Sequence, residues 1–259
     1  MTAPVSAPEI RRGLGYWLAS YQHLLRFEIT NLRVYLAIAL VVQTLMGAGM
    51  AYMYGFYLGD LSPLGQTWLV TGIPALALFP IGFVVVPNVI TQHKLQDTYD
   101  FVRSLPVPRM IPALSTFTVF TLLSLPGTAL ALFIANLRYD ADLTPSWSLV
   151  PAVFLASLMA TSVGYAVGHA IPDPRVTNLF LNILVFTVLL FTPIVVPIDL
   201  FPEWLATLHR FLPFFHMAQV LRAGLSVGLV ADVATSYAVL AAWTAVSWGL
   251  AAWILGWRR

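Results

Sequence analysis

Long apolar stretches alternate with short polar segments along the entire chain. Each stretch holds about 20 successive apolar residues, the length that an α-helix needs to cross the hydrocarbon core of a bilayer. The stretches are apolar on every side of the helix, whereas a helix of a soluble bundle carries one apolar stripe. The pattern therefore predicts an all-α membrane protein with six spanning helices, at residues 34–57, 66–91, 110–135, 147–169, 176–197 and 232–256.

The segment between the fifth and sixth predicted spans is too apolar for a water-exposed loop and too interrupted for a span. In residues 192–225, Pro197, Pro202 and Pro213 separate two short amphipathic pieces. Each piece is about 10 residues long, half the length that crosses a bilayer. We interpret them as two re-entrant half-helices, which enter the membrane and return, within residues 199–228.

The residues before the first span predict an amphipathic helix over 14–30. Its apolar positions follow helical spacing and form one stripe. Such a helix is expected to lie in the headgroup layer. Two roles stay open for it: a membrane anchor alone, or a lever in contact with a cytoplasmic partner. The stripe consists of Leu14, Trp17, Leu18, Tyr21 and Leu25.

The longest polar loop, between the second and third spans, predicts a second short helix over 92–105. Leu95, Tyr99 and Val102 follow the spacing i, i+4, i+7 and give this helix one narrow apolar face. Pro106 and Pro108 end the helix and return the chain to the membrane. A short helix with one apolar face and charged flanks suits docking into a cleft on another protein. A solvated connector is the alternative.

The composition supports a single membrane domain over residues 1–259. Hydrophobic residues make up 59% of the chain and charged residues 9%, whereas about a quarter of the residues of a soluble domain are charged. The first 13 residues lack the apolar core of a cleavable signal peptide, so we expect the first span to direct insertion.

Basic residues gather on one side of the predicted spans. By the positive-inside rule, that side faces the cytoplasm. The distribution predicts a multi-pass protein of the cytoplasmic membrane, with both termini in the cytoplasm and residues 199–228 on the outer face. Ten of the 13 basic residues lie on the cytoplasmic side: Arg11, Arg12, Arg26, Arg33, Lys94, Arg103, Arg109, Arg175, Arg258 and Arg259.

Several kinds of chemistry are excluded by residues that the sequence lacks. Without cysteine, the chain has no disulfides, no thiol catalysis and no cysteine-ligated metal. Its only lysine, Lys94, does not follow a glycine-rich turn, so there is no P-loop for nucleotide hydrolysis. His209 and His216 lie on either side of Pro213 and are interpreted as interfacial polar residues rather than metal ligands. We expect no catalytic, cofactor or metal site, and no nucleic-acid partner.

The interiors of the predicted spans contain no Asp, Glu, Lys or Arg. Carriers driven by protons or sodium ions usually place ionisable groups at this depth. Their absence disfavours a secondary transporter. It also favours an apolar or amphipathic cargo, because a strongly ionic one would find little electrostatic stabilisation at mid-membrane.

The outer half of the first span is rich in methionine and aromatic residues, which adapt to varied apolar ligands. The same residues suit contact with lipid or with the membrane interface, and both alternatives stay open. Candidate substrate-path residues are Met46, Met50 and Met53 in the first span, Phe83 in the second, and Phe186 and Phe191 in the fifth.

Two smaller patterns concern the fourth span and the turn after it. Gly164 and Gly168 predict close packing against another helix. His169, Asp173 and Arg175 are expected to form a capped turn between the fourth and fifth spans.

The order of residues before the last span is typical of one family. Thr192-Pro193-Ile194 leads to Pro197, then to Leu200-Phe201-Pro202-Glu203-Trp204-Leu205, Leu212-Pro213 and Gln219-Val220-Leu221-Arg222. With this order and six spans, the chain resembles the permease subunits of type-2 ABC transporters, whose exporter fold is also seen in the ABCG class. The resemblance implies re-entrant helices above the exit of a translocation path. The exit gate would contain Pro197, Pro202, Trp204, Pro213 and Arg222.

The resemblance also implies roles for the two amphipathic helices. The loop after the second span is similar to the family's coupling element, although Asp97 stands where the family has glycine. The 14–30 helix corresponds to the connecting helix that touches the ATPase, with Trp17, Tyr21 and Arg26. The implied ATPase-coupling residues are Leu95, Asp97, Thr98, Tyr99, Val102 and Arg103.

The partners implied by the resemblance are cytoplasmic nucleotide-binding ATPase subunits, which carry the ATP and Mg²⁺, and a second permease subunit, identical or homologous. The expected function is the transmembrane subunit of an ATP-driven exporter. Its expected substrate is a drug, a lipid or a lipid-linked glycan. Alternatives are an ABC exporter of heme or small ions, and a structural or sensory membrane subunit that transports nothing.

Overall fold

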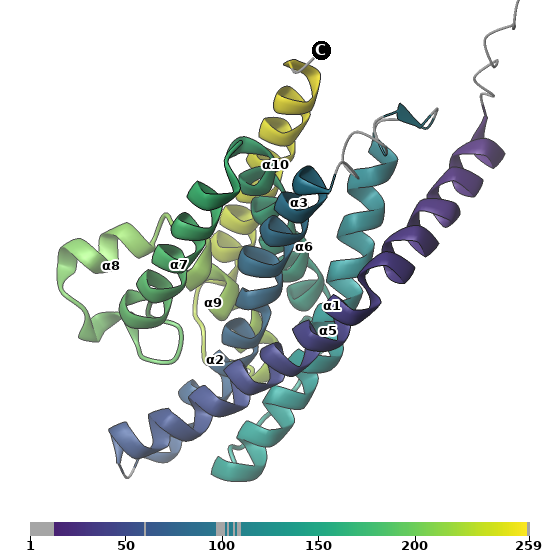
Figure 1. The fold of residues 1–259 in the computed structure, drawn as a ribbon. Coiled ribbons are helices and arrows are strands. Elements are labelled where there is room, and N and C mark those ends of the chain that lie inside the picture. Colours follow the sequence, from purple (N-terminus) through teal and green to yellow (C-terminus); the bar gives the residue numbers. More distant parts are fainter. Residues whose placement is uncertain are drawn as a thin grey trace, which may run out of the picture.

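The computed structural model describes residues 13–59, 61–96, 102, 104, 105, 107 and 110–257. Within these residues, six helical stretches are long and apolar enough to cross a membrane, which confirms the predicted number of spans. The start of α1 and the end of α10 lie at one end of the bundle, and the connection from α1 to α2 lies at the other (Figure 1). The elements are α1 (Leu14–Leu58), α2 (Pro63–Pro80), the π-helical turn η1 (Ile81–Val85), α3 (Val86–Leu95), α5 (Met110–Tyr139), α6 (Leu149–Ala170), α7 (Pro174–Phe191), the 3-10 turn η2 (Ile198–Leu200), α8 (Glu203–His209), α9 (Pro213–Leu225) and α10 (Val233–Trp257).

The first span and the amphipathic segment before it form one helix. The sequence predicts a separate helix over 14–30, but α1 runs without interruption for 45 residues. No proline or glycine occurs between Tyr16 and Met46, so nothing breaks the ladder of backbone hydrogen bonds. The amphipathic segment is therefore the rigid first third of the first spanning helix.

The face that this segment buries also differs from the predicted stripe. Leu14 and Leu18 are exposed, whereas Leu24 and Leu32 are buried together with the polar Ser20 and Glu28. The buried positions recur every four residues and face α5 along the length of α1. The side of α1 that packs against α5 is therefore next to the apolar stripe that the sequence predicts, and does not coincide with it.

The second span lies at the centre of the bundle. It consists of α2, η1 and α3 in succession, and 89% of its most apolar window is buried, against 17% for α7. The turn of π-helix is marked by the bond from the Val86 N–H to the Ile81 carbonyl. The central position explains why this helix is apolar on every face.

Glycines allow the helices to approach this central span closely. A Cβ on Gly164 of α6 would overlap the carbonyl oxygen of Gly82, and one on Gly168 would lie 3.0 Å from Ile90. The close packing predicted for Gly164 and Gly168 is confirmed, and their partner is the second span of the same chain.

The fifth span is shorter than the sequence predicts. The sequence suggests a helix to residue 197, but α7 ends at Phe191, and Thr192 is extended, with φ −95° and ψ 132°. Pro193 explains the early end, because a proline disfavours helical conformation in the residue before it. At the start of α7, the predicted capped turn is present: the Asp173 carboxylate accepts a hydrogen bond from the Arg175 N–H at 2.7 Å.

The loop between α5 and α6 packs against the end of α9. Thr144 donates its N–H to the Leu225 carbonyl at 2.9 Å, and Ser146 donates to the Gly224 carbonyl at 2.9 Å. A Cβ on Gly224 would lie 2.7 Å from the Cα of Leu149, so α9 touches the start of α6. These contacts attach the 192–225 segment to the rest of the bundle.

Candidate functional site

Two short helices lie between the fifth and sixth spans, and they differ in burial. α9 is buried along most of its length and packs on α2, α6 and α10. α8 projects away from the bundle (Figure 1), and its Trp204 is 70% exposed. Of the two helices, α9 is the one that belongs to the core.

The prolines of this segment start its helical pieces. Pro197 precedes η2, Pro202 precedes α8, and Pro213 is the first residue of α9. Proline suits these positions because the first N–H groups of a helix have no partner within the helix. The prolines therefore set where each piece begins.

Arg222, near the end of α9, is fully buried. Its Nη2 donates to the carbonyls of Ile194 at 2.6 Å and Trp68 at 3.3 Å. Its Nε donates to the Thr71 hydroxyl at 3.2 Å, and its Nη1 to the Gln219 side chain at 2.7 Å. The guanidinium joins three parts of the chain: α2, Ile194 in the connection after α7, and α9.

The charge of Arg222 is balanced without an ion pair. Among the described residues, its hydrogen-bond partners are neutral oxygens, and its guanidinium carbon lies 3.9 Å from the centroid of the Trp68 ring. Burial lowers the pKa of Arg222 to about 9. Because this pKa is above physiological pH, the side chain stays protonated and the surrounding oxygens and aromatic ring stabilise it.

The turn between α8 and α9 is attached to α10. His216 donates from Nε2 to the Arg210 carbonyl at 2.8 Å, and its Nδ1 lies 3.0 Å from the Ser236 hydroxyl. The indole N–H of Trp243 donates to the Phe211 carbonyl at 2.9 Å. His216 thus joins α9 to α10 and to the residue that follows α8. His209 lies on α8.

The opposite end of the bundle contains the candidate coupling residues. Leu95, the last residue of α3, is 59% exposed, and Val102 is half-buried. Asp97, Thr98, Tyr99 and Arg103 lie outside the described residues. The proposed contact of these six residues with an ATPase stays a prediction.

Lys94 connects this end of α3 to the turn after α6. Its ammonium donates to the Gly168 carbonyl at 2.6 Å and to the Ile171 carbonyl at 3.0 Å. Carbonyls at the end of a helix carry partial negative charge, which a cation there stabilises. The only lysine of the sequence therefore caps α6 and joins the end of α3 to the turn after α6.

The candidate connecting residues on α1 contact α5. Trp17 and Tyr21 stack with ring centroids 5.8 Å apart, and the Tyr21 hydroxyl lies 2.7 Å from the Thr118 hydroxyl. Arg26 is exposed. The aromatic pair belongs to the α1–α5 interface, while the side chain of Arg26 is free to meet another molecule.

Two turns beyond Tyr21 on α1, Glu28 is buried with 7% of its surface exposed. Thr116 donates to one carboxyl oxygen at 3.0 Å, and the other, Oε2, has no partner among the described residues. Burial raises the pKa of Glu28 to about 7. The carboxyl therefore gains and loses its proton near neutral pH.

The candidate substrate-path residues occupy different surroundings. Phe83 is buried in an aromatic cluster, 5.5 Å from Phe79 and 4.8 Å from Phe214 between ring centroids. Met46 and Met50 are half-buried. The other three, Met53, Phe186 and Phe191, are exposed.

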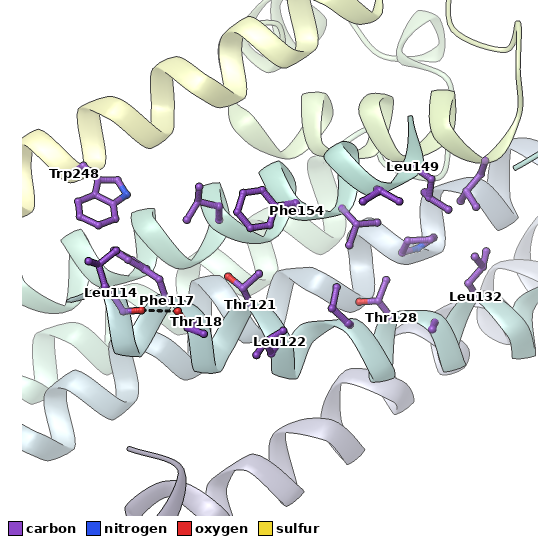
Figure 2. Close-up of a pocket in the computed structure, with 17 residues that line it drawn as sticks. Leu114, Phe117, Thr118, Thr121, Leu122, Thr128, Leu132, Leu149, Phe154 and Trp248 are labelled. Carbon is purple, nitrogen blue, oxygen red and sulfur yellow. Dashed lines mark hydrogen bonds between the residues drawn. The ribbon is translucent and has the colours of Figure 1, made fainter. Parts of the chain in front are cut away.

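A long apolar groove of about 740 Å³ lies elsewhere, between α5 and α6. Trp248 of α10 stands at one end, and Leu132 and Leu149 stand at the other (Figure 2). None of the six candidate substrate-path residues lines this groove. The volume lies within the range of about 300–1,000 Å³ that is typical of ligand pockets.

Sequence reasoning missed three features of this arrangement. It predicted Arg222 as part of an outer exit gate and did not predict that its side chain is fully buried. It did not assign roles to Glu28 or to the groove. One signal was available for the groove: Thr118, Thr121 and Thr128 recur at helical spacing along an otherwise apolar span.

The sequence was compared with known proteins. The family model described as ABC-2 family transporter protein matches residues 49–253. No curated protein matches the sequence. The matched region begins in the second half of the first span and nearly reaches the end of the sixth, so it includes the 192–225 segment, the groove and the loop after α3. With six spans and a match over most of its length, the chain belongs to the ABC-2 family of transporter membrane proteins.

Proposed function

We propose that this chain is the membrane subunit of an ATP-driven exporter that moves an apolar or amphipathic substrate out across the cytoplasmic membrane. The family match over residues 49–253 carries this proposal. Members of the family are transport subunits that work with an ABC ATPase. The chain has no P-loop, so the ATP would be bound and hydrolysed by that separate ATPase.

The end of the bundle that carries Leu95 is the proposed docking site of the ATPase. Leu95 is exposed at the end of α3, and Lys94 next to it is bonded to the turn after α6. A push on this end of α3 would therefore reach α6 as well as the central span. Differential affinity of the ATPase for two states of the permease would then shift their populations.

The exposed face of α7 is the proposed contact with a second permease subunit. Phe186 is 65% exposed and Phe191 is 52% exposed, and α7 is the least buried of the six spans. A path between two subunits would bring Phe186 and Phe191 close to the substrate.

An uncharged cargo is proposed because the charged residues of the six spans lie at their ends. Lys94, Arg138 and Arg175 are each within two residues of a span end. A charged substrate at mid-membrane would be costly to bury without partners there. A drug, a lipid or a lipid-linked glycan avoids this cost when its charged groups stay at the membrane surface and only its apolar part enters the middle of the membrane.

Co-expression with an ABC ATPase encoded beside this chain tests the proposal. The two proteins should purify together, and reconstituted ATPase activity should rise with at least one member of a panel of apolar and amphipathic compounds. Leu95→Asp should reduce this stimulation several-fold. Leu64→Asp, at an exposed position in the first turn of α2, is the matched control and should not. Isolation of the chain without any ATPase would contradict the proposal.

The proposed orientation can be tested separately because the native chain is free of cysteine. Single cysteines at Leu95 and Glu203 should be labelled by a membrane-impermeant maleimide from opposite faces, with Leu95 on the cytoplasmic side. Labelling of both positions from the same side would overturn the orientation.

A further inference from the structure

The groove between α5 and α6 runs along α5, one of the six helices long enough to span a membrane. Its lining follows α5 from Leu114 to Leu132. Those 18 steps of helix correspond to about 27 Å, close to the hydrocarbon thickness of about 30 Å. The groove thus extends through nearly the whole apolar depth of the bilayer.

Several residues that line the groove are exposed along the sides of α5 and α6. Leu122 on α5 and Phe154 on α6 stand on its rim and are each 59% exposed, and Val150 is 65% exposed. Leu122 lies near the middle of the spanning helix α5, and Val150 and Phe154 lie in the first two turns of the spanning helix α6. A molecule that enters the groove would therefore come from the bilayer, where apolar compounds concentrate.

The walls of the groove would reject charge. The 17 described residues that line it include no Asp, Glu, Lys, Arg or His. A charged group buried there would meet no counter-ion and few hydrogen-bonding groups. Aromatic rings of Phe117, Phe154 and Trp248 offer flat apolar surfaces instead.

Besides the indole N–H of Trp248 at one end, three threonines provide the polar side-chain groups of the lining, and two of them are already engaged. Thr118 bonds to the Leu114 carbonyl at 2.8 Å and to Tyr21 at 2.7 Å. Thr128 donates to the Ser124 carbonyl at 2.7 Å and accepts from Gln43 at 2.8 Å. Their hydroxyls therefore hold α5 to its own backbone and to α1.

Thr121 is different. Its side chain is 8% exposed, it lines the groove near mid-length (Figure 2), and its hydroxyl has no hydrogen-bond partner among the described residues. A buried hydroxyl without a partner is costly. A ligand with one hydrogen-bonding group could satisfy this atom, whereas a hydrocarbon chain could not.

We propose that this groove is a binding site for an uncharged, largely apolar small molecule that enters from the bilayer and hydrogen-bonds to the Thr121 hydroxyl. The molecule carries one isolated polar group, such as an amine N–H, an amide or a carbonyl, on an aromatic or alicyclic body. The inference deepens the proposed function, since it names a ligand class and a site for an exporter of apolar compounds. Ligand pockets commonly combine apolar walls with one or two placed polar groups.

Binding of N-phenyl-1-naphthylamine tests the site. This probe is an uncharged aromatic amine with one N–H donor, and its emission rises in apolar surroundings. The protein would be placed in phosphatidylcholine nanodiscs, and empty nanodiscs would be subtracted to leave the saturable binding. Energy transfer from tryptophan reports proximity, because Trp248 lines the groove.

Four variants separate the contributions. Thr121→Val removes the hydroxyl at nearly constant volume and should weaken binding about two- to tenfold, the value of one neutral hydrogen bond. Thr121→Ser keeps the hydroxyl and should retain affinity. Val153→Trp fills the groove and should abolish saturable binding. Thr244→Val, on α10 and outside the groove lining, is the matched control and should bind as the native chain does.

Two outcomes would overturn the inference. If Val153→Trp binds the probe normally, the groove is not its site. If Val153→Trp loses binding but Thr121→Val does not, the groove accepts apolar matter such as a lipid acyl chain without recognising a polar group. No ATPase is present in this assay, so a failure of the proposed export function leaves the result on the groove intact.

Discussion

The guanidinium of Arg222 stacks on the indole ring of Trp68, with its carbon atom 3.9 Å from the ring centroid. This contact joins α9, which lies between the fifth and sixth spans, to the beginning of the buried second span. The same guanidinium bonds to the Ile194 carbonyl, so the residues after α7 are part of the arrangement. Among the contacts that attach the 192–225 segment to the bundle, this side chain is the one that joins it to the buried second span at Trp68 and Thr71.

Replacement of Arg222 tests this connection. Arg222→Leu should lower the free energy of unfolding by roughly 2–4 kcal/mol, because the carbonyls and the hydroxyl around it lose a charged donor inside the protein. Thermal unfolding in detergent, followed by fluorescence-detected size exclusion, measures the change. Gln219→Ala removes one of the four bonds and should cost about 1 kcal/mol. Equal unfolding temperatures for Arg222→Leu and the native chain would show that the connection is unimportant for stability.

The pKa of Glu28 predicts a pH dependence of stability. Burial raises this pKa from 4.5 to about 7, so the folded state binds the carboxyl proton more tightly than the unfolded state does. Its contribution to stability is fully present below about pH 4.5 and is lost as the pH rises through about 7. The loss is on the order of 3 kcal/mol.

Glu28→Gln should remove this dependence. The variant should be more stable than the native chain at pH 8 and similar to it at pH 5, because the amide is neutral at both values. The exposed Glu203 provides the control: Glu203→Gln should leave the pH profile of the native chain unchanged. A profile of Glu28→Gln that still falls between pH 5 and pH 8 would assign the effect to another group.

The contact between α6 and the second span predicts the effect of two alanine substitutions. Gly164→Ala places a methyl group against the Gly82 carbonyl and should destabilise the protein by about 1–3 kcal/mol. Gly49→Ala, on α1, meets nothing within 4 Å and should be neutral or gain up to about 1 kcal/mol from helix propensity. Unfolding temperatures of the two variants measure the difference. Similar values would mean that α6 can move away from Gly82 at little cost.

Removal of the ammonium of Lys94 should loosen the end of α6. Lys94→Met takes the cation from the Gly168 and Ile171 carbonyls and should raise hydrogen exchange in residues 168–173. A helix-terminal charge of this kind contributes about 0.3–2 kcal/mol, which corresponds to a change of up to about thirtyfold in local opening. Lys94→Arg keeps a cation at this position and should restore much of the protection. Unchanged exchange in Lys94→Met would show that other contacts hold this turn.

The spans were predictable because their evidence is local in sequence. A run of about 20 apolar residues is sufficient to predict a spanning helix. Its exact end is less predictable: the fifth span was predicted to reach residue 197, but Pro193 ends α7 at Phe191. The turn capped by Asp173 and the close packing of Gly164 were predicted for the same reason, since each depends on the chemistry of a few neighbouring positions.

The arrangement of the helices was not predictable in this way. Leu14 and Leu18 are as apolar as Leu24 and Leu32, but only the second pair faces α5. In a membrane, lipid and protein are both apolar surroundings, so hydrophobicity does not identify the side on which a helix packs. The proline-rich segment likewise indicated two short helices, and nothing in its composition distinguished the buried α9 from the projecting α8.

The sequence by itself determined the number of spans, the lack of a P-loop motif and the family of the chain, because composition, motif and residue order are properties of the chain alone. Tertiary structure decided the burial of Arg222 against Trp68, the burial of Glu28 and the groove that leaves Thr121 without a partner. The first two depend on contacts between residues 154 and 88 positions apart, and the groove is a surface that two helices form together. These contacts exist only after the chain has folded.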